Sequence, residues 1–307
     1  MHKKIKIIII LTIIIAVTGY TFLFMHNKHS ESGEKNNIAP CKYMRIVSLS
    51  PSITETLFAL GLGDKVVGVT RFCKYPPEAL KIQKVGGYLD LNYEAVVNLK
   101  PDVVFILPEQ QNAGKYFKEL GIDSVELHNR LTADIMETVL KIGHVCGKQK
   151  EAEKLHSELT TQMENIKEKI KSKNRPRVLV CVDRVLSFGS IKEMYIAGKK
   201  TSYDELINIA GGINAYSGND ISYPTIYREG LLELNPEIII DIIPELKEKG
   251  LTKEQVIGYW KKIPGVDAIK NNRIYIIDQD YAVIPGPRFI LFLKELVTII
   301  HPEIKTD

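Results

Sequence analysis

Two glutamates, Glu94 and Glu229, stand in matching sequence contexts 135 residues apart. Each lies near the start of a short predicted helix that ends in leucine, a polar residue, proline and an acidic residue, and each helix leads into an apolar strand. A carboxylate in a first turn is favoured by the helix dipole, so helix initiation alone would account for both residues. The repeat also fits two similar lobes that face each other, each of which carries one such carboxylate.

Motifs that mark enzymes are missing from the sequence. It contains no Gly-x-Ser-x-Gly element, no P-loop and no dinucleotide fingerprint, and the Gly61-Leu62-Gly63 stretch follows a predicted helix rather than a strand. We therefore expect no enzymatic activity and no cofactor. The formal net charge of +4 is small and evenly spread, and no nucleic-acid-binding motif accompanies it, so a nucleic-acid partner is not expected.

Residues that could hold a metal ion directly are few. A zinc or manganese site needs several histidine, cysteine or carboxylate ligands together. The cysteines are widely spaced without a Cys-x-x-Cys pair, which favours isolated buried thiols, although export would permit a disulfide. The residues concerned are His128, His144, His156, His301, Cys41, Cys73, Cys146 and Cys181. The sequence predicts no metal site.

The N-terminus has the layout of an export segment. A basic start, Met1 to Lys6, precedes an apolar run that reaches Met25. Residues 1–25 are therefore a signal peptide or an N-terminal membrane anchor. The lack of a small-x-small cleavage site favours the anchor, and Cys41 lies too far downstream to be a lipoprotein cysteine. The polar residues 26–41 read as a flexible tether, and the folded part should be extracytoplasmic, secreted or anchored to the outer face of the cytoplasmic membrane.

Apolar periodicity predicts the elements that must position these residues. Residues 42–147 and 173–307 each alternate strands with helices, which predicts two α/β lobes with mainly parallel sheets. Residues 148–172 contain no proline or glycine and have apolar residues at helical spacing, which predicts one long helix of roughly 36 Å. A first helix from about residue 53 to 60 has Ser52 or Thr54 as its expected N-cap. The other predicted strands and helices are 45–49, 66–69, 92–99, 103–107, 114–120, 124–127, 133–146, 177–182, 194–196, 202–210, 228–234, 238–243, 253–262, 273–277 and 288–300.

Several short motifs together resemble one protein family. They include SLSPSITE at residues 48–55, NLKPDVV at 98–104 and IPGPR at 284–288. Over residues 44–302 the chain is similar to the metal-chelate solute-binding proteins of ABC importers, and most of all to cobalamin-binding members. This resemblance implies two similar α/β lobes joined by one rigid inter-lobe helix, with the ligand cleft between the lobes. It also implies two partners, an ABC permease dimer with its cytoplasmic ATPases and a metal-chelate ligand, and a monomeric protein.

The resemblance also assigns roles to individual residues. Glu94 and Glu229 match the two exposed glutamates that dock such proteins onto arginines of the permease. The ligand-binding positions that it implies are aromatic residues, which suit a flat macrocycle, and two arginines on cleft-facing loops. They are Phe72, Tyr88, Tyr223, Tyr281, Arg71 and Arg184. Leu107 stands where the family has an aromatic residue, which departs from the pattern of the cobalamin binders.

Three functions follow as expectations. The first is capture of a corrinoid such as cobalamin and its delivery to the permease. The second is binding of a ferric siderophore or of haem, since Arg71 and Arg184 would suit an anionic ligand and Tyr88 or Tyr223 could be an axial ligand of haem. The third, of another class, is a membrane-tethered ligand sensor without transport.

Overall fold

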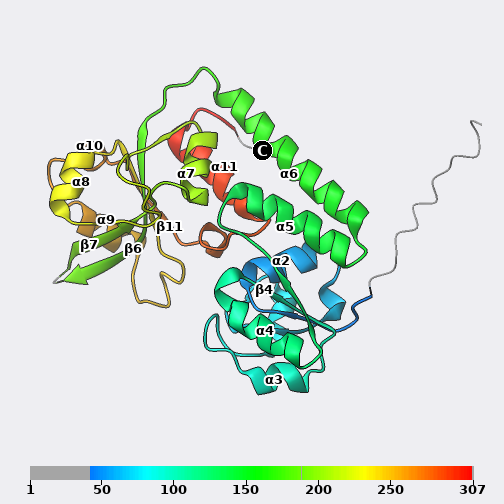
Figure 1. Cartoon of the computed structure of the whole chain (residues 1–307). Coiled ribbons are helices and arrows are strands. Elements are labelled where there is room, and N and C mark those ends of the chain that lie inside the picture. Colours follow the sequence, from blue (N-terminus) through cyan, green and yellow to red (C-terminus); the bar gives the residue numbers. More distant parts are fainter. Residues whose placement is uncertain (1–41, 188, 306–307) are drawn as a thin grey trace, which may run out of the picture. The chain divides into compact units, whose positions relative to one another are not determined.

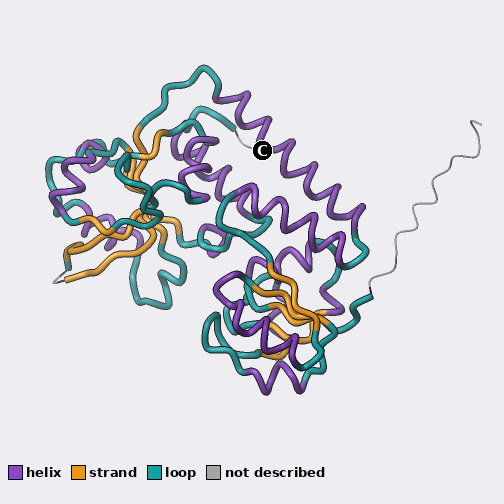
Figure 2. Tube along the Cα trace, in the orientation of Figure 1, coloured by secondary structure: helices purple, strands orange, loops and turns teal. Residues whose placement is uncertain are grey.

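The computed structural model describes residues 42–187 and 189–305 (Figure 1). The predicted export segment, the tether and Cys41 lie outside the described residues. Strands gather into two separate sheets along the chain, and helices lie against both of them (Figure 2). The predicted α/β class with two sheets is confirmed.

The first sheet has five parallel strands in the order β3-β2-β1-β4-β5. They are β1 (Ile46–Ser48), β2 (Val66–Val69), β3 (Gln83–Lys84), β4 (Val103–Ile106) and β5 (Asp123–Glu126). Every residue of β1 and β4 is buried. Central parallel strands are covered on both faces, which explains why these two read as continuous apolar runs. Together with the helices that pack on it, this sheet forms the N-terminal lobe.

Four α-helices accompany the first sheet, namely α2 (Pro51–Ala59), α3 (Tyr93–Asn98), α4 (Gln111–Glu119) and α5 (Thr132–Val145). The predicted N-cap of α2 is wrong, because Ser50 occupies the N-cap and both Ser52 and Thr54 lie inside the helix. Pro51 stands at the first helical position, where its fixed φ angle suits the helix and its missing N–H is not needed. The helix therefore begins earlier than the apolar periodicity indicates.

The long helix α6 (Gln149–Ile170) matches the prediction to within two residues at each end. Its buried residues include Leu159, Ile166 and Ile170, which belong to the apolar stripe seen in the sequence. Leu155 packs against the apolar cores of both lobes. Helix α6 therefore joins the two sheets along the chain and also contacts the core of each (Figure 1).

The second sheet forms the C-terminal lobe and has the strand order β11-β10-β6-β7-β9, with β8 beside β6. Its strands are β6 (Arg177–Ser187), β7 (Ser190–Ile196), β8 (Ile213–Asn214), β9 (Thr225–Ile226), β10 (Ile238–Ile242) and β11 (Ile274–Ile277). Strands β6, β8, β10 and β11 are parallel, whereas β7 runs antiparallel to both β6 and β9. Its helices are α7 (Ser202–Ile209), α8 (Arg228–Leu234), α9 (Lys253–Trp260), α10 (Asp267–Lys270) and α11 (Phe289–Ile300). Short 3₁₀ turns lie at Gly63–Lys65, Pro77–Lys81, Pro108–Gln110 and Asp280–Ala282.

The sequence repeat corresponds to a repeated structure. Helix α3 leads into β4 and helix α8 leads into β10, and each of these strands pairs in parallel with the first strand of its lobe. The guanidinium of Arg45 donates to the carbonyl of Leu99 at 2.7 Å, and that of Arg177 donates to the carbonyl of Leu234 at 2.6 Å. In both lobes an arginine thus satisfies a carbonyl at the helix C-terminus.

The residues that follow the two helices also match. Lys100 and Asn235 both adopt left-handed backbone conformations, with φ of 46° and 36°, immediately before a proline. The carboxylates of Asp102 and Glu237 then accept the backbone N–H of the two arginines, each at 2.8 Å. The same local structure therefore occurs once in each lobe, and Glu94 and Glu229 lie at equivalent positions in it.

Candidate functional site

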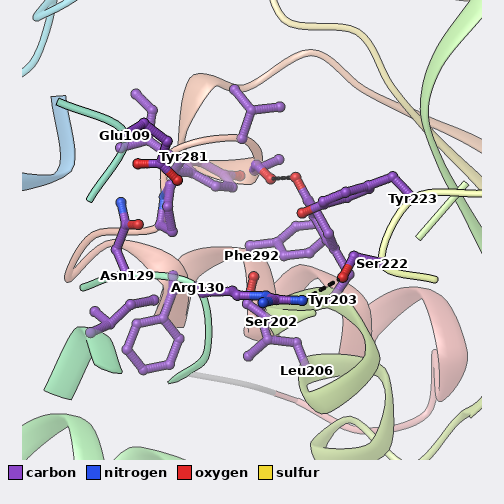
Figure 3. A pocket seen from close by; sticks show the side chains of 16 residues that line it. Glu109, Asn129, Arg130, Ser202, Tyr203, Leu206, Ser222, Tyr223, Tyr281 and Phe292 are labelled. Carbon is purple, nitrogen blue, oxygen red and sulfur yellow. Dashed lines mark hydrogen bonds between the residues drawn. The ribbon is translucent and has the colours of Figure 1, made fainter. Parts of the chain in front are cut away.

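A cavity of about 410 Å³ is lined by residues of both lobes (Figure 3). This volume falls within the range of roughly 300–1,000 Å³ that small-molecule sites occupy. The N-terminal lobe contributes loop residues and one helix residue, and the C-terminal lobe contributes the rest. The lining consists of Glu109, Asn129, Arg130, Ile135, Ser202, Tyr203, Leu206, Ser222, Tyr223, Tyr281, Ala282, Val283, Ile284, Pro285, Phe289 and Phe292.

Three tyrosines line the cavity. Tyr203 donates its hydroxyl to the carbonyl of Ala282 at 2.7 Å, and Tyr281 donates to Glu295 at 2.9 Å. Burial, together with the bond to Glu295, raises the pKa of Tyr281 to about 12. The hydroxyl protons of Tyr203 and Tyr281 are therefore already donated to groups of the protein. Tyr223 is half exposed and makes no hydrogen bond to any described residue through its hydroxyl.

Arg130 is the one arginine or lysine of the cavity lining. Its guanidinium donates to the hydroxyl of Ser222 at 2.7 Å, which joins the two lobes across the cavity (Figure 3). It forms no ion pair with a carboxylate of the described chain. Surrounding protein raises the pKa of Tyr223, and the charge of Arg130 opposes that rise. An anionic group of a ligand would find its counter-charge here.

The apolar part of the lining comes mainly from helices. Phe289 and Phe292 of α11, Leu206 of α7 and Ile135 of α5 all belong to one buried cluster. Phe292 also makes an edge-to-face contact with Tyr203, with ring centroids 5.8 Å apart. The cavity therefore combines an aromatic and aliphatic wall with a few polar groups, as ligand pockets commonly do.

Two of the predicted ligand-binding residues, Tyr223 and Tyr281, are brought together in this lining. Tyr88 lies just behind it, because its hydroxyl donates at 3.0 Å to Glu109, which does line the cavity. Burial and this bond both raise the pKa of Tyr88 well above its ordinary value. Sequence reasoning missed Arg130, although its place in the loop after β5 is a strand-end position of the kind that forms such clefts.

Phe72 and Arg71 do not belong to the cavity lining. They lie in the turn after β2, where the Arg71 guanidinium sits 5.0 Å from the Phe72 ring centroid. Arg71 also forms an exposed ion pair with Asp90 at 2.7 Å. Phe72 remains 46% exposed, so its ring is open to solvent in this structure.

The predicted loop position of Arg184 is wrong. Arg184 lies within β6, and its side chain is only 7% exposed. Its guanidinium lies 2.6 Å from the fully buried carboxylate of Asp241 and donates to the carbonyl of Ile242. Burial raises the pKa of Asp241 to about 6, against the effect of Arg184. Leu107 is likewise buried in the core of the N-terminal lobe and does not line the cavity.

A buried ion pair joins the lobes beside the cavity. Arg288, just before α11, donates to Glu55 of α2 at 2.5 Å and to Asp280 at 2.8 Å, and its guanidinium lies 3.9 Å from the Tyr75 ring centroid. Burial raises the pKa of Glu55 to about 7, while Arg288 opposes that rise. Because the glycine of the IPGPR motif, Gly286, packs directly on Glu55 and α2, this motif ties the lobes together.

Two further contacts join the lobes. Lys74 pairs with Glu245 at 2.5 Å, and both side chains are nearly half exposed. The backbone N–H of Thr132 donates to the carboxylate of Glu205 at 2.7 Å. Together with Arg130 and Arg288, these contacts hold the two lobes around the cavity.

The two repeated glutamates lie on the surface, away from the cavity lining. Each occupies the first turn of its helix and is exposed. The N-cap Asn92 fixes the start of α3 by accepting the N–H of Ala95 at 2.9 Å. Within residues 42–187 and 189–305, neither Glu94 nor Glu229 has an ion-pair partner.

The described part of the chain contains neither a metal-binding cluster nor a membrane-spanning helix. No group of three or more histidine, cysteine or acidic side chains there is placed to hold a metal ion. None of the helices in that part has the length and apolar character to cross a bilayer. Of the histidines that were not expected to bind a metal, His128 and His144 are exposed and His301 is buried.

Comparison with known proteins places the chain in a family. The model of a periplasmic binding protein family matches residues 46–281. An uncharacterized ABC transporter substrate-binding lipoprotein, YvrC of Bacillus subtilis, is 32% identical over 266 residues, covering 84% of this chain and 80% of that protein. A vitamin B12-binding protein of Vibrio cholerae is 23% identical over 258 residues, covering 83% of this chain and 88% of that protein. The periplasmic heme-binding protein RhuT from Roseiflexus has a TM-score of 0.72 at 25% identity, covering 84% of this chain and 98% of that one. The chain therefore belongs to the periplasmic binding protein family and is an extracytoplasmic, non-enzymatic solute-binding component of an ABC importer.

Proposed function

We propose that this solute-binding protein captures a corrinoid such as cobalamin and delivers it to its permease. The observation that carries this proposal is the aromatic and aliphatic wall of the inter-lobe cavity, in which Tyr223 presents a half-exposed ring beside Tyr203 and Phe292. Such a wall suits the flat face of a macrocycle. The vitamin B12-binding proteins that the chain resembles over most of its length add support. A corrinoid is larger than the cavity volume, so part of it would extend through the opening between the lobes.

Binding of cyanocobalamin to the full chain tests this proposal directly. We expect submicromolar affinity for the wild type and a loss of about tenfold or more for Tyr223→Ala, because removal of one stacked ring from a binding surface costs about 1–3 kcal/mol. Tyr259→Ala is the matched control, since Tyr259 is a partly buried tyrosine of the same lobe outside the cavity lining. Equal affinity of both variants would remove Tyr223 from the site.

A second candidate ligand, an anionic iron chelate such as haem or a ferric siderophore, is favoured by one specific observation. Arg130 reaches into the cavity without a carboxylate partner in the described chain, and a neutral corrinoid does not need this charge. The hydroxyl oxygen of Tyr223 has no hydrogen-bond partner in the described chain, so Tyr223 is the residue to test as an axial ligand of the haem iron. Under this alternative, Arg130→Ala weakens haemin or siderophore binding strongly, whereas under the corrinoid proposal it has little effect on cobalamin.

We also propose that Glu94 and Glu229 dock the loaded protein on the permease dimer. They occupy equivalent places in a repeated helix–strand unit, are exposed, and have no internal partners in the described residues. Two equivalent carboxylates on two lobes suit a partner with two-fold symmetry. The double variant E94R/E229R should abolish uptake and leave ligand affinity unchanged, and E137R/E254R, which reverses one exposed glutamate of each lobe outside α3, α4 and α8, is the control. Normal uptake by E94R/E229R would contradict docking through these two glutamates.

A further inference from the structure

An exposed aromatic patch borders Glu94. It consists of Tyr93, the neighbour of Glu94 in α3, and Tyr116 of α4, which are 38% and 42% exposed. Their ring centroids lie 5.0 Å apart in an edge-to-face arrangement. Helices α3 and α4 are neighbours in the N-terminal lobe (Figure 1), and the two rings form one partly exposed patch on these helices.

The core holds this patch in place from below. Phe117 is fully buried, and its ring centroid lies 5.6 Å from that of Tyr93 and 5.7 Å from that of Tyr116. Both exposed rings are therefore fixed before any partner arrives. Rigid tyrosines supply contact area at a small cost in conformational entropy, which is why they are frequent among the residues that dominate interface energies.

The repeated helix–strand unit does not require these rings. The position equivalent to Tyr93 in the C-terminal lobe is Arg228, yet α8 forms there and leads into β10 in the same way that α3 leads into β4. An aromatic ring at the start of this helix is thus dispensable for folding the unit. A contiguous pair of exposed aromatic rings beside a carboxylate without a partner is instead typical of a protein-binding surface.

We propose that Tyr93 and Tyr116 are the anchor of the N-terminal docking surface, which receives an arginine-bearing, partly apolar segment of the permease. This inference rests on the docking role proposed for Glu94 and adds to it. Glu94 would pair with the arginine of that segment, and the two rings of α3 and α4 would contact its apolar side chains. The patch also makes the two docking surfaces unequal, because Arg228 replaces the ring in the C-terminal lobe.

The experiment measures affinity of the full chain for the permease–ATPase complex of its own cell, reconstituted in nanodiscs. We expect Y93S/Y116S to lower this affinity by about tenfold or more, while the affinity for cyanocobalamin, measured where the variant is fully folded, stays near that of the wild type. The conservative variant Y93F/Y116F keeps the rings and should bind nearly as the wild type does. Leu186→Ser, which changes a similarly exposed apolar side chain of the β6–β7 hairpin, is the surface control.

The outcomes separate this inference from the docking proposal. If E94R/E229R prevents binding to the complex while Y93S/Y116S binds normally, the aromatic anchor is wrong and the docking glutamates stand. If E94R/E229R also binds normally, the docking proposal itself fails. If Y93F/Y116F loses as much affinity as Y93S/Y116S, the rings are not the anchor, because the phenylalanines preserve their contact area.

Discussion

Replacing Arg288 by methionine is expected to lower the free energy of unfolding by about 3–5 kcal/mol. The Glu55 side chain is only 2% exposed, and Arg288 is 14% exposed. The second oxygen of Glu55 lacks a hydrogen-bond partner, so Arg288 is the main group that stabilises the buried negative charge of Glu55. Its removal leaves a carboxylate buried between the lobes without a counter-charge.

Two further interactions of Arg288 add less. Its bond to Asp280 involves a carboxylate that is 39% exposed, so water can replace most of it. Its contact with the ring of Tyr75, at 3.9 Å, contributes about 0.5–2 kcal/mol. The double variant E55Q/R288M removes the buried charge together with its partner, and should therefore recover much of the loss.

Urea unfolding followed by circular dichroism, at about pH 8.5 so that the carboxylate tends to be ionised, measures these differences. Lys74→Ala serves as the control, because the exposed Lys74–Glu245 pair also joins the lobes but should be worth less than about 1 kcal/mol. A loss in Arg288→Met no larger than that in Lys74→Ala would refute the reasoning from burial. So would a double variant that is as unstable as the single one.

Three other changes test separate parts of the structure. Because burial raises the pKa of Glu55 from 4.5 to about 7, the folded state binds its proton more tightly, and the stability due to this group is lost as pH rises through that window. The stability of Glu55→Gln relative to that of the wild type should therefore rise by about 1–3 kcal/mol from about pH 5 to about pH 8, in paired urea titrations. Lys100→Gly should raise the thermal midpoint, since glycine relieves about 1 kcal/mol at a φ of 46°, whereas Asn235→Gly should not, because the Asn235 side chain also bonds to Asp267. Trp260→Phe should lower the free energy of unfolding by about 1–3 kcal/mol, because the indole N–H donates at 2.8 Å to the fully buried carboxylate of Asp241. A smaller loss in urea unfolding would contradict this.

The regular elements could be predicted from the sequence because burial leaves a local pattern. The run of isoleucines in β10 and the spaced apolar residues of α6 each identify their element without knowledge of its neighbours. The repeat was visible for the same reason, since each copy carries its own helix end, proline and acidic residue. Short strands such as β3, β8 and β9, with two residues each, leave no such pattern and depend on pairing with distant strands.

The site was harder to predict because it depends on contacts between distant residues. Arg184 was placed on a loop by family resemblance, beyond the strand predicted at residues 177–182. Strand β6 in fact continues past it, and the buried Asp241 of the neighbouring strand β10 supplies its counter-charge. Arg130 became a candidate only when the structure placed it opposite Ser222, 92 positions away in the chain. Tyr223 and Tyr281 were named through family resemblance, which records such distant contacts indirectly.

Isothermal titration of the full chain, in detergent, with cyanocobalamin, haemin and a ferric hydroxamate siderophore tests the central proposal most directly. We expect submicromolar binding of cyanocobalamin that is weakened by Tyr223→Ala, and much weaker binding of haemin and the siderophore. Tight binding of haemin or the siderophore, lost in Arg130→Ala and accompanied by no response to cyanocobalamin, would contradict the corrinoid proposal and establish the anionic iron chelate instead.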